Sequence, residues 1–172
     1  MAKKNENLEA LRDAMIVRKK VTNVLKVLAL QTQSRLEALE DDLAKATTDE
    51  ERSAITKKIQ EERFNTWLIE KECDLVSTNA SELSGNLRVS NTIWPAYMAE
   101  FAERRVLMDR AMGACNVLQD ELQYIAEAVY ADKNKFTALV LEIEALFNKI
   151  KSLRQADNRF LRQLKDNVNQ KV

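Results

Sequence analysis

The sequence contains no histidine, one proline and only two glycines among its 172 residues. Without histidine, the chain lacks the commonest general base and the commonest metal ligand of proteins. The two glycines, Gly85 and Gly113, lie too far apart to form a glycine-rich phosphate loop. The scarcity of turn residues also argues against a β-sandwich or barrel, which needs many turns. It favours a few long helices instead.

The chain also lacks an excess of either charge, because 27 basic residues balance 27 acidic ones. A neutral chain has no bulk attraction to nucleic acid or to an anionic membrane. No run approaches the roughly 18 apolar residues of a membrane span, and the first residues lack the apolar stretch of a signal peptide. For Cys73 and Cys115 we expect free thiols rather than a disulfide, and hence a reducing compartment, the cytoplasm.

Apolar residues recur at intervals of three and four along nearly the whole chain, which is the spacing of one face of an α-helix. The pattern predicts four helices, with a short turn near residue 133 between the third and the fourth. Thr48 and Glu51 form a capping box at the start of the second helix. Ser84, Gly85 and Asn86 are expected to end that helix, and Pro95 to lie in the first turn of the third.

We therefore predict an all-α protein, an elongated up-down bundle of about four long helices arranged as two antiparallel coiled-coil-like hairpins. Residues 1–172 form one domain, with the first hairpin at about 5–84, a loop at about 84–94 and the second hairpin at about 93–168. The sequence leaves open whether the hairpins bury their apolar stripes against each other within one chain or against other copies.

The third predicted helix has the most regular apolar seam, a heptad pattern. Gly113 lies off this seam, on a line with Val106, Val117 and Tyr124. Close approach of a neighbouring helix would explain a mid-helix glycine, and a tolerated surface glycine is the alternative. The residues expected in the core are Phe101, Met108, Leu118, Leu122, Ile125, Ile143, Phe147 and Ile150.

Two polar residues interrupt the apolar stripes of the third and fourth helices. If the turn between these helices centres near residue 133, Arg104 faces a position about one turn from Asp157. We predict a partly buried ion pair between them that fixes the register of the hairpin. The alternative is that both side chains lie at the edge of the seam and reach solvent.

No residues are assigned to catalysis, to a cofactor or to a metal. Carboxylate metal sites in helical bundles usually contain a Glu-x-x-His pair, which a chain without histidine cannot form. Cys115 lies on the apolar seam, where a packed thiol without an activating base is inert. We expect neither enzymatic activity nor a small-molecule substrate.

Basic residues are concentrated near the start of the chain and near its end. In an up-down bundle these two segments lie at the same end, which would form a positive surface despite the neutral total. The residues expected to contact a partner there are Lys3, Lys4, Lys19, Lys20, Arg154, Arg159 and Arg162.

Two classes of function fit these features. The first is a non-enzymatic helical scaffold, adaptor or assembly subunit whose partner is another protein or a second copy of the chain. An exposed Trp67 or Trp94 would suit such an interface, although Trp67 is expected in the core. The alternative is a nucleic-acid-associated accessory bundle that binds phosphates at the basic end. The zero net charge and the lack of a recognition helix argue against it.

Overall fold

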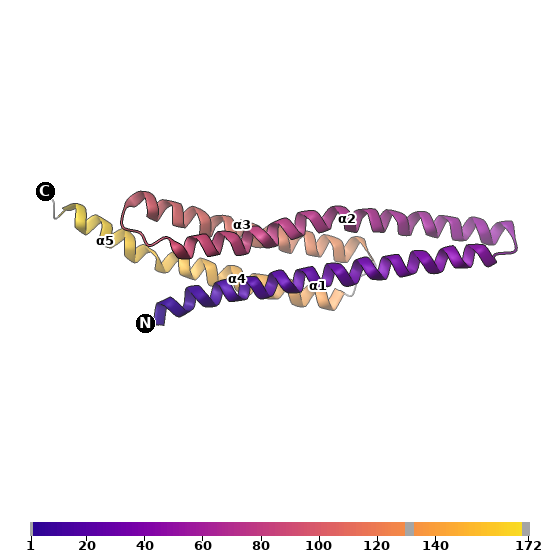
Figure 1. Ribbon diagram of the computed structural model, residues 1–172, viewed down its shortest axis with the longest axis horizontal. Coiled ribbons are helices and arrows are strands. Elements are labelled where there is room, and N and C mark those ends of the chain that lie inside the picture. The colour runs from indigo at the N-terminus through magenta and orange to yellow at the C-terminus, as the bar shows by residue number, and fades with distance from the viewer. Residues whose placement is uncertain (1, 130–132, 170–172) are drawn as a thin grey trace.

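The computed structural model describes residues 2–129 and 133–169, and the side chains of residues 8–129 and 133–164. Within these residues the chain consists of five α-helices, which confirms the predicted all-α class. The molecule is elongated, and its long helices run side by side with alternating direction (Figure 1). In chain order the helices are α1 (Ala2–Lys45), α2 (Asp49–Thr92), α3 (Met98–Ala128), α4 (Lys133–Ala156) and α5 (Asn158–Asn169).

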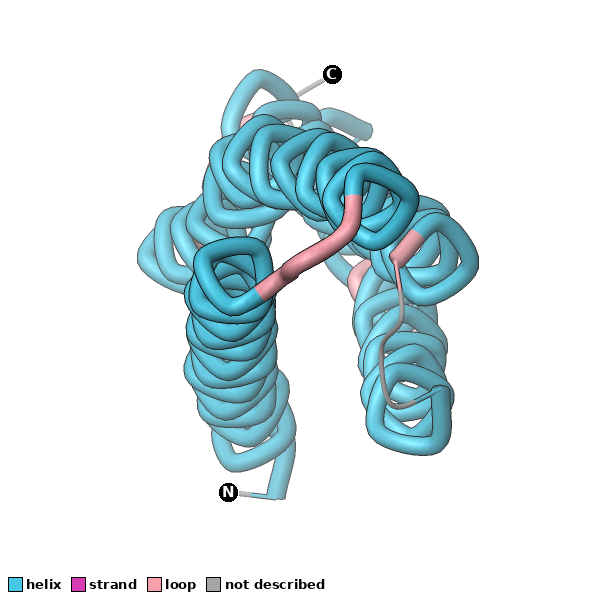
Figure 2. The backbone as a smooth tube through the Cα atoms, turned by 90° about the vertical axis from the view of Figure 1, so that its right-hand side faces the viewer, coloured by secondary structure: helices cyan, strands magenta, loops and turns pink. Residues whose placement is uncertain are grey.

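The four long helices form an up-down bundle within one chain. Each packs on the next along the chain, and α4 packs back on α1. Viewed end-on, the helices form an arch rather than a flat layer (Figure 2). Ion pairs join α1 to α4, because Lys20 Nζ lies 2.5 Å from Glu142 Oε1 and Lys149 pairs with Asp13. Most residues of the apolar stripes are buried within this single chain.

The first hairpin is longer than the second. α1 and α2 have 44 residues each, whereas α3 and α4 have 31 and 24. The end of α1 and the start of α2 therefore project beyond the end of α3 and the start of α4 as a two-helix arm (Figure 1). Leu39 and Leu43 in this arm stay half-buried, because only two helices are present to cover them.

The core of the bundle lies where all four helices run together. Of the eight residues expected in the core, six are buried there and Phe147 is half-buried against them, whereas Phe101 is buried in a separate small cluster. Leu122 is completely buried, as are its neighbours Leu118 and Ile125 on the same seam. The heptad pattern of α3 therefore corresponds to the face that packs against α2 and α4.

The start of α2 has the predicted capping box. Thr48 Oγ1 accepts a hydrogen bond from Glu51 N at 3.2 Å, and Glu51 Oε2 accepts one from Thr48 N at 3.2 Å. The two backbone N–H groups held in this way are donors that the helix itself leaves unpaired. Glu51 Oε2 also accepts a hydrogen bond from Thr47 N at 3.1 Å. The bonds from the Thr47 and Thr48 backbone lower the pKa of the Glu51 carboxyl, the Thr47 bond most of all.

The predicted end of α2 is wrong. The helix continues through Gly85 to Thr92, so the loop covers 93–97 rather than about 84–94. Leu83 and Leu87, on either side of Gly85, are both buried in the core. Burying two leucines stabilises the helix by more than the ~1 kcal/mol that a mid-helix glycine costs. The hydroxyl of Ser84 also donates to a carbonyl of the preceding turn, so it does not interrupt the helix.

The predicted second hairpin is not continuous to residue 168. α4 ends at Ala156, and after Asp157 a separate helix, α5, begins at Asn158. Phe160 N donates to Asp157 O at 2.9 Å, which is a tighter turn than that of an α-helix. α5 contacts α3 and α4 and projects from the end of the bundle (Figure 1).

Pro95 lies in the loop before α3 and not in the first turn of the helix. The helix begins at Met98, because Glu100 supplies the cap there. Its Oε2 atom accepts hydrogen bonds from Ala96 N at 2.7 Å and from Tyr97 N at 3.2 Å. The carboxylate also has a favourable interaction with the positive end of the helix dipole.

Gly113 and Trp67 both lie on outer surfaces. A Cβ atom added to Gly113 meets nothing within 4 Å, so the prediction of close approach is wrong within the chain. Trp67 is 52% exposed instead of buried, and its ring lies 5.5 Å from that of Phe64. The next two residues, Leu68 and Ile69, occupy the core positions of that turn. Trp67 therefore falls on the side of α2 that faces away from α1 and α3.

Candidate functional site at the α2–α3 loop

The end of the bundle at which α2 leads into α3 is organised around Arg104, a residue of α3. Its Nε atom donates to Asp157 Oδ2 at 2.5 Å, and its Nη2 lies 3.5 Å from Asp157 Oδ1. Its Nη1 donates to the Ser90 carbonyl and, at 3.1 Å, to the Ile93 carbonyl. The structure thus contains the predicted Arg104–Asp157 pair, with both residues only 3% exposed. Its role in fixing the register stays a prediction.

This one guanidinium joins α3 to two other parts of the fold. Ser90 and Ile93 lie at the end of α2, where helix carbonyls have no partner within the helix. Asp157 lies at the break between α4 and α5. A planar group with several fixed donors suits this set of acceptors better than an ammonium group would. The sequence could indicate the carboxylate, but not the two carbonyls, because a backbone acceptor does not depend on residue type.

A small second core lies beside Arg104. It consists of Phe101 from α3 with Phe160 and Leu164 from α5, and it is separate from the main core. Trp94 of the loop packs edge-on against Phe160, with ring centres 5.1 Å apart and ring planes at 80°. The aromatic pair and the Arg104 hydrogen bonds together hold the loop on the bundle.

The outer side of this loop exposes large apolar groups. Trp94 is 74% exposed and Tyr97 71%, and Met98 is about half exposed; we refer to these three residues as the loop surface. Two arginines flank it, with the Arg105 guanidinium 5.3 Å from the ring centre of Phe101 and that of Arg159 4.7 Å from Phe160. Aromatic residues next to arginine are typical of the energetically important centre of protein–protein interfaces.

Comparison with known protein families, with curated proteins and with solved structures gives no match. The function has to be inferred from the surfaces of this chain and from the groups that they present.

The structure does not bring all of the predicted basic residues together. The side chains of Lys3 and Lys4 lie outside the described residues, although their backbone belongs to the first turns of α1. Lys19 and Lys20 lie about four turns further along α1. Lys20 is bound there to Glu142 of α4, with Nζ–O distances of 2.5 and 2.7 Å.

The three arginines near the end of the chain also differ in their surroundings. Arg154 Nη2 donates to Asp109 Oδ2 at 2.9 Å, so its charge is compensated by a carboxylate of α3. Arg159 and Arg162 belong to α5, where Arg159 lies over the Phe160 ring and Arg162 is exposed. Arg159 thus lies beside the ring on which Trp94 packs, whereas Lys19 and Lys20 belong to α1, which does not contact α5.

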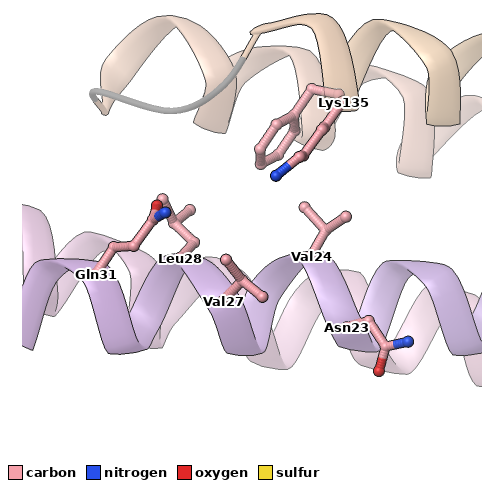
Figure 3. A pocket seen from close by; sticks show the side chains of 7 residues that line it. Asn23, Val24, Val27, Leu28, Gln31 and Lys135 are labelled. Carbon is pink, nitrogen blue, oxygen red and sulfur yellow. The ribbon is translucent and has the colours of Figure 1, made fainter.

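A pocket of about 150 Å³ lies between α1 and the start of α4. In Figure 3 the side chains of Val24 and Leu28 point towards α4 and that of Lys135 towards α1, whereas Asn23 points away. Among the described residues that line the pocket, the polar groups are two amides and an amine, with no carboxylate, hydroxyl or thiol. Such a mainly apolar gap offers no pair of groups for acid–base or nucleophilic catalysis.

The two cysteines are free thiols in the structure. Burial raises the pKa of the Cys115 thiol to about 12, so it stays protonated and unreactive near neutral pH. Burial also raises the pKa of Cys73, and the nearby carboxylates of Asp74, Glu70 and Glu72 add to the shift. Neither thiol has the lowered pKa of a catalytic nucleophile.

Two carboxyls meet between α2 and α3. The carboxyl of Glu121 on α3 faces that of Glu72 on α2. Burial raises the pKa of Glu121, and the facing Glu72 and the neighbouring Asp120 raise it further. Ionisation of Glu121 is therefore unfavourable at this contact between the two helices.

Two negative findings concern only the residues that the structure describes. No group of three or more cysteines, aspartates and glutamates is arranged there to hold a metal ion. No helix in these ranges is both long enough and apolar enough to cross a membrane.

Proposed function

We propose that this protein is a non-enzymatic helical scaffold or adaptor that binds a partner protein through the loop surface. The observation behind the proposal is the exposure of Trp94 and Tyr97 on a loop that is firmly attached to the bundle. Large aromatic side chains are unfavourable in water, and a rigid exposed group of them marks an interaction site. Its removal from water on binding would supply affinity.

The chemistry around the loop surface suggests what the partner presents. Arg105 and Arg159 lie beside the small second core, and Arg105 also donates to Asn158 Oδ1 at 2.8 Å. Both guanidiniums are held in place by rings beneath them, so little side-chain entropy is lost when they bind a carboxylate. We expect a segment with an apolar face flanked by Asp or Glu.

The free thiols of Cys73 and Cys115 fit a reducing compartment, and we propose that the protein acts in the cytoplasm. The absence of histidine from the whole chain supports a role without catalysis, since other acids and bases would have to replace it. The loop surface and the long bundle together suit a protein that holds a partner at one end of a rigid body.

The nucleic-acid alternative has less support. It relied on seven basic residues at one end, and two of these, Lys20 and Arg154, are already bound to Glu142 and Asp109. A carboxylate at that distance cancels most of the attraction of the cation for phosphate. Binding to DNA or RNA that weakens steeply with added salt would support this alternative, whereas an apolar interface is nearly insensitive to salt.

The proposal can be tested by comparing which proteins co-purify with the wild-type chain and with a variant of the loop surface. We expect Trp94→Ser combined with Tyr97→Ser to lose a defined set of proteins that wild type retains. The matched control is Val27→Ser with Leu30→Ser, two exposed apolar residues of α1 far from the loop. Equal sets for wild type and the loop variant would contradict the proposal, provided that circular dichroism shows the variant to be folded.

A further inference from the structure

The outer face of α3 has its own regular pattern, separate from the seam that packs in the core. Its six residues follow each other at alternating steps of four and three, which places them on one side of the helix. They are Val106, Arg110, Gly113, Val117, Asp120 and Tyr124. We refer to them as the α3 outer face.

Five of the six residues of the α3 outer face are exposed, and Val117 is half-buried. Val106 and Tyr124 are 48% and 47% exposed, and Arg110 and Asp120 are exposed charges. No salt bridge involves either of these two charges within the described part of the chain. Gly113 leaves an open space where a side chain would stand, because its added Cβ meets nothing within 4 Å.

The order of residues on this face is symmetric about position 115. Val106 and Tyr124 are equally distant from it, as are Arg110 and Asp120, and as are Gly113 and Val117. When two identical helices pack antiparallel about a two-fold axis, residues equally distant from the centre lie opposite each other. Each apolar residue would then meet an apolar residue or a glycine, and each charge would meet the opposite charge.

We propose that two copies of this chain associate through their α3 outer faces, antiparallel and about a two-fold axis near residue 115. Arg110 of one copy pairs with Asp120 of the other, and this ion pair occurs twice. Val106 packs on Tyr124, also twice. In the centre, Val117 fills the space that Gly113 leaves. This explains a glycine in the middle of α3 at a position where no other part of the chain comes within 4 Å.

The charges favour a second copy over an unrelated partner. An unrelated helix would have to supply an acid and a base at the right spacing, whereas this chain already contains both. Leu75 and Val89 of the neighbouring helix α2 are exposed as well. Exposed apolar surface is therefore not confined to α3. The association uses another face than the loop surface and goes beyond the proposed partner binding.

The test exchanges the two charges. Wild type should have twice the 19.8 kDa mass of the chain at micromolar concentration, measured by light scattering or sedimentation. Arg110→Asp places two aspartates opposite each other, and Asp120→Arg places two arginines opposite each other. Each variant alone should therefore show half the mass of wild type.

Mixing the two variants should restore the dimer, because every aspartate of one then faces an arginine of the other. The double variant Arg110→Asp, Asp120→Arg should also be dimeric by itself. The matched control is Arg12→Asp, the same change at an exposed position of α1, a helix that does not contact α3; it should remain dimeric. A monomeric wild type, or single variants that remain dimeric, would overturn the proposal.

Gly113→Leu separates loss of the interface from loss of folding. Within one chain the new side chain meets nothing, and leucine is a better helix former than glycine, so the melting temperature of the single chain should rise. In the dimer the leucine would occupy the space of Val117, and the mass should fall by half. A Gly113→Leu chain that is more stable and still dimeric would place the interface elsewhere and overturn the proposal.

Discussion

The Arg104–Asp157 pair allows the most quantitative prediction. Replacing Asp157 with Leu leaves a buried guanidinium with two carbonyl acceptors and no counter-charge. Breaking a buried pair in this way costs about 3–5 kcal/mol of unfolding free energy. Since a domain of this size is stable by only about 5–15 kcal/mol, the variant should lose roughly a fifth or more of its stability and should unfold at a lower urea concentration than wild type.

Removing both charges should cost less than the sum of the two single changes. Arg104→Met combined with Asp157→Leu leaves no buried charge, although the Ser90 and Ile93 carbonyls lose their donor. We therefore expect a coupling energy of at least about 2 kcal/mol in the double-mutant cycle. The matched control is Arg63→Met, which breaks an exposed pair with Glu40 at 3.1 Å and should cost under about 1 kcal/mol.

Urea unfolding followed by circular dichroism measures these free energies. A Trp67→Phe background adds a local probe, because Trp94 is then the sole tryptophan and its ring packs on Phe160. If Asp157→Leu costs less than about 0.5 kcal/mol, the pair is not buried as described and the reasoning fails. Additive single effects would show that the two side chains do not interact.

Three further predictions concern the bundle itself. Leu122→Ala should cost about 2–5 kcal/mol in the same unfolding assay, because the side chain is completely buried. Gly85→Ala should instead stabilise the protein by roughly 0.5–1 kcal/mol, since the position is helical and the added Cβ meets nothing within 4 Å. Glu121→Gln should stabilise the protein at pH 7, because the raised pKa means that ionisation of Glu121 is unfavourable in the fold. That advantage should shrink as the pH falls through the raised pKa towards 4.5, the ordinary value for Glu, because protonation of Glu121 then stabilises wild type. An advantage of the variant that does not depend on pH would contradict the Glu72–Glu121 contact.

The helices and their main seams could be predicted because apolar spacing and the Thr48–Glu51 cap are local signals. The partner of Arg104 could also be predicted, since the register of an antiparallel hairpin follows from its turn. The end of α2 could not, because the local signal of Gly85 is overridden by the burial of Leu87 against other helices.

The surfaces were harder to predict than the core. Burial of Trp67 depends on which sides of α2 are covered by neighbours, and periodicity alone does not give this. The basic end was expected from a sum of charges along the chain. The sum could not show that Lys20 would pair with Glu142 and Arg154 with Asp109. Those contacts depend on which side of α4 faces α1 and which side faces α3.

The most direct test of the central claim, that the loop surface binds a protein, is photo-crosslinking in the cells that produce this chain. A photoreactive phenylalanine analogue in place of Trp94 should form a discrete covalent adduct with a protein other than this chain. The same analogue in place of Glu50, at the tip of the arm, should form no such adduct. Adducts to nucleic acid at position 94, or the absence of any adduct there, would contradict the claim.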